Sequence, residues 1–234
     1  MKSISSRQNP LFKRISAAIR EHADEIAIEG PKPVADALRT GWKPIEVIER
    51  GVHFTEHLFD VLAETRSPQN VIGLFHRPHW SSSDILQRRD TVAVALDAVQ
   101  DPGNVGTIVR LAAAFDAAGV LLLPGCADPF GPKAIRASVG AILNVPVAAV
   151  SPSDLHGLNL IAADMNGAAV DPPARDAVFV FGNEGSGVSS ELMRNAKTIA
   201  ISMSKRVESL NVASSAAILL ARSFALRSSL SSRA

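Results

Sequence analysis

Three short segments in the C-terminal half of the chain carry side chains suited to chemistry. They are DPGNVGTIVR (Asp101 to Arg110), FGNEGSG (Phe181 to Gly187) and ISMSKRVESLNV (Ile201 to Val212). Each segment joins an apolar, strand-like run to a helical pattern through Gly, Asn, Ser or a charged residue. In α/β proteins the functional groups lie at such connections. We therefore expect the chemistry of this protein in these three segments.

The first segment offers an amide, Asn104, and a guanidinium, Arg110. Asn104 stands where a helix is expected to begin, and as an N-cap it would accept a bond from an N–H of the first turn. Arg110 lies among apolar residues, where it needs a partner because an unpaired buried charge is costly. That partner is either a carboxylate, Asp101 or Asp116, or a phosphate or substrate oxygen. The segment alone leaves both interpretations open.

The second segment is a glycine loop, GNEGSG, from Gly182 to Gly187. Its three glycines allow positive φ angles and close approach of a ligand to the backbone. The spacing fits neither a P-loop nor the G-x-G-x-x-G pattern, and Glu184 would repel a pyrophosphate. The loop suits a ligand that has positive charge and no phosphate, such as S-adenosylmethionine. A plain glycine turn is the alternative.

The third segment contains Ser209 and Asn211 before an Ala-rich helical pattern. Asn211 occupies a cap-like position, so capping and a surface loop explain the segment in structural terms. Lys205 and Arg206 are either solvated charges or contacts to RNA phosphates.

The elements that must position these segments alternate between strand and helix after residue 90. Short apolar runs of this kind are typical of parallel strands covered on both faces, so the pattern predicts a mainly parallel sheet. The expected strands are residues 92–96, 120–123, 145–150, 160–163, 178–181 and 198–201. The expected helices are residues 105–118, 132–139, 189–196 and 212–226.

The first third of the chain indicates a smaller α/β unit of mixed charge. We expect helices at 11–22, 33–39 and 54–64 and strands at 44–48 and 70–75. We therefore expect a first domain at residues 1–78, a linker rich in Ser and charge at 79–90, and a second domain at 91–234.

Composition excludes several classes of protein. The 234 residues are 47% hydrophobic and 20% charged, as in ordinary globular domains. The single cysteine, Cys126, rules out a disulfide framework and suits a reducing cytoplasm. We expect no signal peptide, no membrane span and no metal site, since the six histidines lack ligand spacing. The absence of tyrosine argues against a sheet of rings that stacks bases.

Taken in this order, the segments resemble the SpoU (TrmH-like) branch of the SPOUT RNA methyltransferases. The match includes LDAVQDPGNVGTIVRLAAAF, ADPFGPKAIRASVGA, FVFGNEGSGV and ISMSKRVESLNVASSAAI. SRQNPLFKRI and IEGPKPVADAL resemble the substrate-binding domain of that family, which is related to a ribosomal-protein fold. Ser202 departs from the usual proline and Lys205 from the usual glycine, both in the loop expected to cradle the cofactor.

The resemblance implies transfer of a methyl group from S-adenosylmethionine to a ribose 2′-hydroxyl, in rRNA more than in tRNA. It also implies a C-terminal trefoil knot and a homodimer through the catalytic domain. The implied catalytic residues are Asn104, Arg110, Glu184, Ser209 and Asn211. The implied cofactor-binding residues are Gly182, Asn183, Gly185, Gly187, Ile201, Met203 and Leu210.

RNA is expected to contact basic residues, although a solvated helix face explains the first four equally well. The candidates are Arg7, Lys13, Arg14, Arg20, Lys133 and Arg136. Two other functions compete with methyl transfer. One is an RNA-binding or ribosome-assembly protein on the same fold without methyl transfer. The other, a Rossmann-like nucleotide-binding enzyme, conflicts with the glycine spacing and with Glu184.

Overall fold

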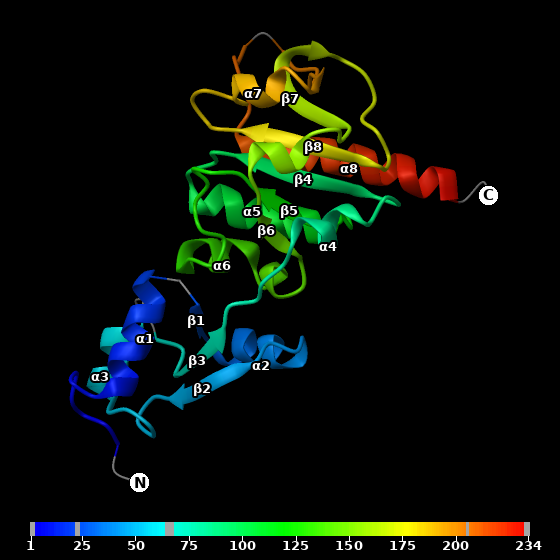
Figure 1. The fold of residues 1–234 in the computed structure, drawn as a ribbon. Coiled ribbons are helices and arrows are strands. Elements are labelled where there is room, and N and C mark those ends of the chain that lie inside the picture. The colour runs from blue at the N-terminus through cyan, green and yellow to red at the C-terminus, as the bar shows by residue number, and fades with distance from the viewer. Residues whose placement is uncertain (1–2, 22–23, 64–67, 205, 232–234) are drawn as a thin grey trace. The chain divides into compact units, whose positions relative to one another are not determined.

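The computed structural model describes residues 3–21, 24–63, 68–204 and 206–231 (Figure 1). The chain divides into two compact units. The first comprises Met1–Pro78 together with Phe130–Arg136, and the second comprises His79–Pro129 and Ala137–Ala234.

The first unit is built on a three-stranded antiparallel sheet in the order β1-β3-β2. Its strands are β1 (Glu25–Glu29), β2 (Pro44–Glu49) and β3 (Val71–His76), and its helices are α1 (Pro10–Glu21), α2 (Pro31–Arg39) and α3 (Glu56–Leu62). The expected helices and two of the strands are confirmed within the described residues, which leave out positions 22 and 64 at two of the expected helix ends, whereas β1 was not predicted. Its short acidic-ended sequence, EIAIE, buries only alternate residues, Ile26 and Ile28.

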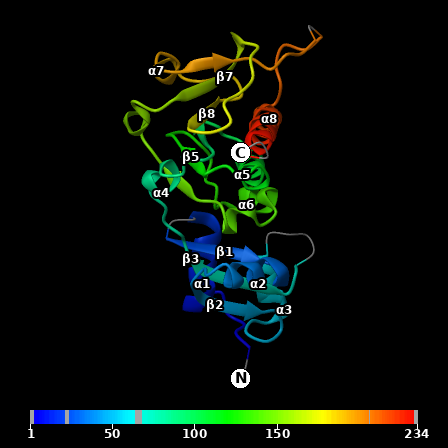
Figure 2. The ribbon, with the colours of Figure 1, turned by 90° about the vertical axis from the view of Figure 1, so that its right-hand side faces the viewer.

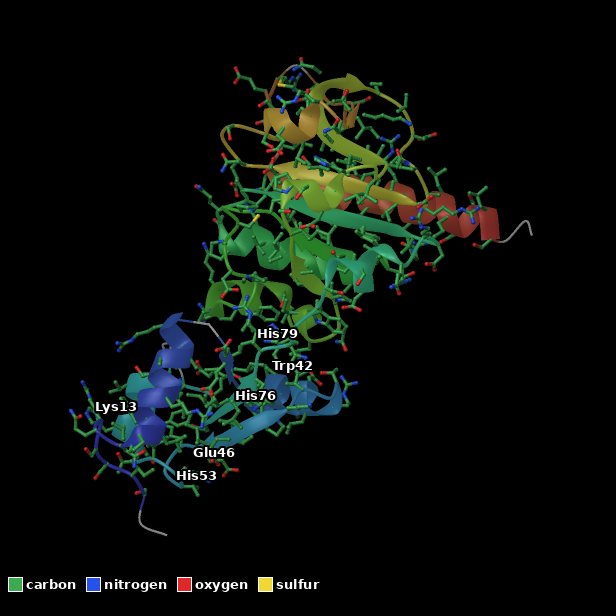
Figure 3. The ribbon with its side chains drawn as sticks, viewed as in Figure 1. Lys13, Trp42, Glu46, His53, His76 and His79 are labelled. Atoms are coloured by element: carbon green, nitrogen blue, oxygen red, sulfur yellow. The ribbon has the colours of Figure 1, made fainter. Side chains whose placement is uncertain are left out.

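Helix α1 shows how sequence spacing creates the core of this unit. Phe12, Ile15 and Ala18 recur every three residues and are buried against α3 and the sheet. Lys13 and Arg14 lie between them on the exposed face, where Lys13 is labelled in Figure 3. The helix is therefore amphipathic, with its basic residues in solvent.

The second unit contains a six-stranded sheet in which every paired strand is parallel, as predicted. The order is β6-β5-β4-β8-β7-β9. The strands are β4 (Val92–Asp97), β5 (Val120–Leu122), β6 (Val147–Ala149), β7 (Leu160–Ala168), β8 (Ala177–Gly182) and β9 (Lys197–Ile199). All residues of β4 are buried because helices cover both faces of the sheet.

The helices of the second unit form two layers, seen edge-on in Figure 2. Helices α5 (Pro102–Ala114) and α8 (Val212–Ser231) pack against each other and against β4 and β8 on one face. The opposite face packs on α4 (Ser82–Leu86), α7 (Ser190–Met193) and a 3₁₀ turn, η2 (Pro152–Leu155). The chain also forms α6 (Pro132–Ser138) and a second 3₁₀ turn, η1 (Ala141–Leu143).

The expected linker, residues 79–90, instead contains α4. Ser81 and Asp84 form a capping box that starts this helix. Ile85 is fully buried in the core of the second unit, beside Ala118 and Leu121. Burial of this side chain makes the segment part of the second unit, which corrects its assignment as a linker.

The order in which the chain adds strands to the sheet reverses between β4 and β8. From β4 the chain continues to β5 on one side, and from β8 it continues to β9 on the other. Ligands of open α/β sheets bind beyond the carboxyl ends of the strands at such a switch point. The trefoil knot and the ribosomal-protein relationship of the first unit stay predictions. Within the described residues, no helix has the length and apolarity needed to cross a membrane.

Candidate active site

A cavity of about 500 Å³ lies at the carboxyl ends of β7, β8 and β9, a volume typical of small-molecule sites. Three of the five expected catalytic residues line it, namely Glu184, Ser209 and Asn211. All seven expected cofactor-binding residues line it as well: Gly182, Asn183, Gly185, Gly187, Ile201, Met203 and Leu210. One wall was not predicted, and it consists of Ala163, Asp164, Met165 and Asn166 from β7.

The glycine loop is closed by its own backbone. Asn183 N donates to Gly187 O at 3.0 Å, and Gly187 N donates to Asn183 O at 2.9 Å. Gly187 has a φ of 71°, which favours glycine. A Cβ on Gly182 would lie 2.1 Å from the carbonyl carbon of Gly187, so only glycine fits there. The loop is thus a tight glycine turn and a wall of the cavity at the same time.

Two hydrogen bonds tie this loop to the end of β4. Asn183 Nδ2 donates to Ala98 O at 2.9 Å, and Ser189 N donates to Asp97 Oδ2 at 2.7 Å. Asp97 is only 8% exposed, and it was not among the site residues predicted from the sequence. A carboxylate that follows a wholly apolar strand was the signal that could have revealed it, because buried charges need partners.

Glu184 links all three sequence segments. Its Oε1 accepts from Asn104 Nδ2 at 2.8 Å, and Asn104 Oδ1 accepts from Asn211 Nδ2 at 3.1 Å. The backbone N–H groups of Gln100 and Asp101 each donate to Glu184 at 3.4 Å. A single chain of hydrogen bonds therefore joins the glycine loop, the start of α5 and the start of α8.

These contacts determine the ionisation of Glu184. Burial raises the pKa of its carboxyl group, but the hydrogen bonds from Asn104 and from backbone N–H groups favour the anion. The net result is a pKa below the ordinary carboxyl value. Glu184 is consequently a carboxylate at neutral pH, and its oxygens are engaged by protein donors.

The starts of α5 and α8 are capped differently. Asp101, rather than Asn104, is the N-cap of α5, since its carboxylate accepts from Gly103 N at 2.6 Å and Pro102 opens the helix. Asn104 lies in the first turn, which leaves its side chain for Glu184. Asn211 does cap α8, as predicted, by accepting from Ala213 N at 2.9 Å.

Arg110 differs from its expected surroundings. It is exposed on α5 and does not belong to an apolar, buried face. Neither expected carboxylate pairs with it: Asp101 caps α5, and Asp116 binds Arg88 and Arg227. Arg110 has no hydrogen bond or ion pair to any described residue, and it does not line the cavity. Because it is exposed, the guanidinium is solvated and accessible to a phosphate or substrate oxygen from another molecule.

The six predicted RNA contacts are all exposed. Arg14 is already paired, because its Nε donates to Glu25 Oε2 at 2.9 Å. Lys133 and Arg136 lie on α6 and are absent from the cavity lining. Ser202 is exposed, whereas Lys205 lies outside the described residues.

The charges of the cavity limit what it can hold. Its described lining contains two carboxylates, Asp164 and Glu184, and neither Lys nor Arg. An anionic pyrophosphate finds no countercharge on these walls, whereas a cationic ligand does. The described residues include no cluster of His, Cys, Asp or Glu that could hold a metal ion.

Known proteins resemble this chain in sequence and fold. The family model described as "SpoU rRNA Methylase family" matches residues 91–221. A 23S rRNA guanosine 2′-O-methyltransferase of Bacillus subtilis is 30% identical over 214 residues, which are 86% of this chain and 84% of the relative. The crystal structure of an AdoMet-bound rRNA methyltransferase from Sinorhizobium meliloti superposes with a TM-score of 0.85 at 30% identity, over 95% of this chain and 97% of that one.

A third protein supports the fold alone. The AdoMet-bound SpoU methyltransferase AviRb of Streptomyces viridochromogenes is 24% identical, has a TM-score of 0.85, and is matched over 95% of this chain and 99% of its own.

Proposed function

The chain belongs to the SpoU rRNA methylase family, and from this premise we propose that it methylates a ribose 2′-hydroxyl of ribosomal RNA with S-adenosylmethionine. One observation carries this proposal. The residues expected to hold the cofactor all line one cavity, at the carboxyl ends of β7, β8 and β9. The Bacillus subtilis relative is named for the same reaction, and the Sinorhizobium meliloti structure contains AdoMet.

S-adenosylmethionine fits the chemistry of this cavity. It carries a sulfonium cation and no phosphate, and the described lining is acidic. The backbone around Gly182, Ile201 and Leu210 would hold it. When bound, it supplies an activated methyl group with its own leaving group, so the transfer needs no metal.

Arg110 has the electrostatic role. A ribose hydroxyl is a poor nucleophile at neutral pH, so negative charge that develops on its oxygen must be stabilised. Arg110 has no described protein partner and can hold that oxygen or an adjacent phosphate in position. A guanidinium does not lose its proton in proteins, so the arginine is not the base.

Asn104, Glu184 and Asn211 would order the three segments around the reacting groups through their chain of hydrogen bonds. Ser209 is exposed on the cavity and can contact the ribose directly. In this assignment only Arg110 and Ser209 contact the RNA, while the other three act by positioning.

RNA would bind along the basic face of the first unit. Arg7, Lys13 and Arg20 are exposed there, whereas Arg14 is neutralised by Glu25. Each phosphate contact steepens the salt dependence of binding by about one unit of slope. Charge reversal of Lys13 and Arg20 should weaken binding and flatten this slope, and an unchanged slope would exclude this surface.

Three further features come from the family resemblance and are proposed with it: the trefoil knot, a homodimer through the second unit, and a cytoplasmic location. The single, half-buried Cys126 suits a reducing compartment. Sedimentation of the purified chain tests the dimer, and a monomer at working concentrations would contradict it.

Mapping of 2′-O-methyl groups in RNA from cells with and without the gene tests the function. We expect one ribosomal site to lose its methyl group and to regain it with the wild-type gene but not with Arg110→Ala. A protein that only binds RNA or assists assembly would leave every methyl group in place. Calorimetry separates the remaining alternative, since a nucleotide-binding enzyme would bind NAD in place of S-adenosylmethionine.

A further inference from the structure

The wall of the cavity formed by β7 contains a carboxylate, Asp164. Strand β7 pairs with β8 only from Leu160 to Ala162. Its pairing with β9 is then interrupted between Ala163 and Ala168. Asp164 therefore lies in an irregular stretch of strand, and such bulges redirect side chains beside functional sites.

This stretch is held at both ends. Asp164 Oδ1 accepts from Asn166 N at 2.7 Å, which closes a turn typical of Asp and Asn. Gly167 then passes so close to β9 that a Cβ would lie 2.7 Å from Ile199 N. The half-buried Asp164 side chain is consequently held in place on the cavity wall.

The two carboxylates of the described lining differ in what they have left to bind. Glu184 receives hydrogen bonds on both oxygens, from Asn104 and from two backbone N–H groups. Asp164 uses Oδ1 within its own turn, and Oδ2 accepts no hydrogen bond from any described residue. Asp164 thus keeps more acceptor capacity for a ligand than Glu184 does.

We propose that Asp164 is a cofactor-binding residue whose Oδ2 accepts a hydrogen bond from S-adenosylmethionine. This inference rests on the proposed function. The cofactor presents suitable donors on either side of its sulfonium, the ribose hydroxyls and the ammonium group. A carboxylate bonds strongly to both kinds of donor. Its charge also complements the cation at short range.

Asp164→Asn tests the proposal. Asparagine keeps the oxygen that accepts from Asn166 N, so the turn is preserved, while Oδ2 is replaced by a donor. We expect the Kd for S-adenosylmethionine, measured by calorimetry, to rise about ten- to a hundredfold. Asp171→Asn is the matched control. Asp171 lies just after β7, pairs with Arg222 at 2.8 Å and is absent from the cavity lining, so the Kd of this variant should not change.

5′-Methylthioadenosine identifies the donor, because it keeps the ribose hydroxyls and lacks the ammonium group. If Asp164→Asn weakens its binding as well, Asp164 binds the ribose. If only S-adenosylmethionine binds more weakly, Asp164 acts on the part of the cofactor that 5′-methylthioadenosine lacks, the sulfonium and the amino-acid group with its ammonium. Thermal unfolding checks the fold, and Asp164→Ser, which can also close the turn, replaces the asparagine variant if that variant fails to fold.

Different results would overturn the role of Asp164 and the proposed function. Tight binding by the wild type and an equal Kd for a folded Asp164 variant would overturn the role of Asp164 alone. Absence of S-adenosylmethionine binding by the wild type would overturn the proposed function as well.

Discussion

The two ends of the parallel sheet use polar residues in opposite ways. The cavity at the amino ends of β4, β7 and β8 is smaller, about 180 Å³, and contains Arg88, Arg89 and Asp176. All three charges are paired: Arg89 with Asp176 at 3.1 Å, and Arg88 with Asp116, which lies outside the lining, at 3.2 Å. At the carboxyl ends, Asp164 keeps an unused oxygen, and glycines line the wall.

This difference separates structural charge from functional charge. Paired surface charges add little beyond local order. A polar group with an unused hydrogen-bond acceptor in a cavity lowers the stability of the fold. Its presence there is consistent with binding of a ligand. We therefore expect substitutions at the carboxyl ends and at Arg110 to affect chemistry, and those at the amino ends to affect neither chemistry nor folding appreciably.

Arg110→Ala should have the largest effect. Loss of one electrostatic contact to a developing oxyanion lowers turnover by about two to three orders of magnitude. The Kd for S-adenosylmethionine should stay unchanged, because Arg110 does not line the cavity. Single-turnover methylation and calorimetry measure the two quantities. Normal turnover would refute the assignment of Arg110.

Gly182→Ala should come next. The new Cβ would lie 2.1 Å from both Gly187 C and Val188 N, which are backbone atoms that cannot turn aside. We expect a loss of about 3 kcal/mol in the free energy of unfolding and loss of cofactor binding. Gly185→Ala is the steric control for stability, since its Cβ would meet Asn183 Oδ1 at an ordinary 3.5 Å. Equal unfolding midpoints for the two variants would contradict the close packing at Gly182.

Glu184→Gln should have a smaller effect that depends on pH. The folded-state pKa of Glu184 lies below its ordinary value, so the unfolded chain binds the proton more readily. The carboxylate therefore stabilises the fold above the ordinary carboxyl pKa of about 4.3. This stability is lost as the pH falls through the lower, folded-state pKa. Denaturant titrations should show that the difference in free energy of unfolding between wild type and variant shrinks in that pH range. A difference independent of pH would contradict the lowered pKa of Glu184.

Two substitutions at Asn211 separate its role as the cap of α8 from its hydrogen bond to Asn104. Asn211→Ala should cost about 1 kcal/mol through loss of the cap on α8. Asn211→Asp keeps an acceptor for Ala213 N but cannot donate to Asn104. The aspartate variant should thus retain stability and lose turnover, as measured by unfolding and by methylation rates. If it retained both, the link to Asn104 would have no role.

Arg89→Ala should have the smallest effect. Its exposed pair with Asp176 contributes about 0.5 kcal/mol or less. Turnover should equal that of the wild type in the same methylation assay. A tenfold loss would show that the amino ends also serve the reaction and would erase the contrast between the two ends.

Much of the second unit could be predicted because its strands are continuous apolar runs. All six strands occur where the sequence indicates them, and Gly182 to Gly187 line a cavity as expected. Strand β1 and helix α4 were missed, since one is short and the other begins in a serine-rich stretch. The capping box of Ser81 and Asp84 was a readable signal for α4.

The site was harder to predict at residues whose role or exposure depends on the three-dimensional structure. Asn104 resembles an N-cap in sequence, yet Asp101 takes that position because Pro102 opens the helix. Arg110 follows apolar neighbours in sequence, but the turn of the helix exposes it. Asp164 was overlooked because β7 was expected to end at Ala163, and no local pattern shows that the strand continues past the cavity.

The most direct test of the central claim is methyl transfer by the purified chain to ribosomal RNA from cells that lack the gene. S-adenosylmethionine labelled in its methyl group supplies the signal, and the RNA is digested to nucleosides. We predict label in one 2′-O-methylated nucleoside, with almost none when Arg110→Ala replaces the wild type. Label on a base, or tight cofactor binding without any labelled ribose, would contradict the account.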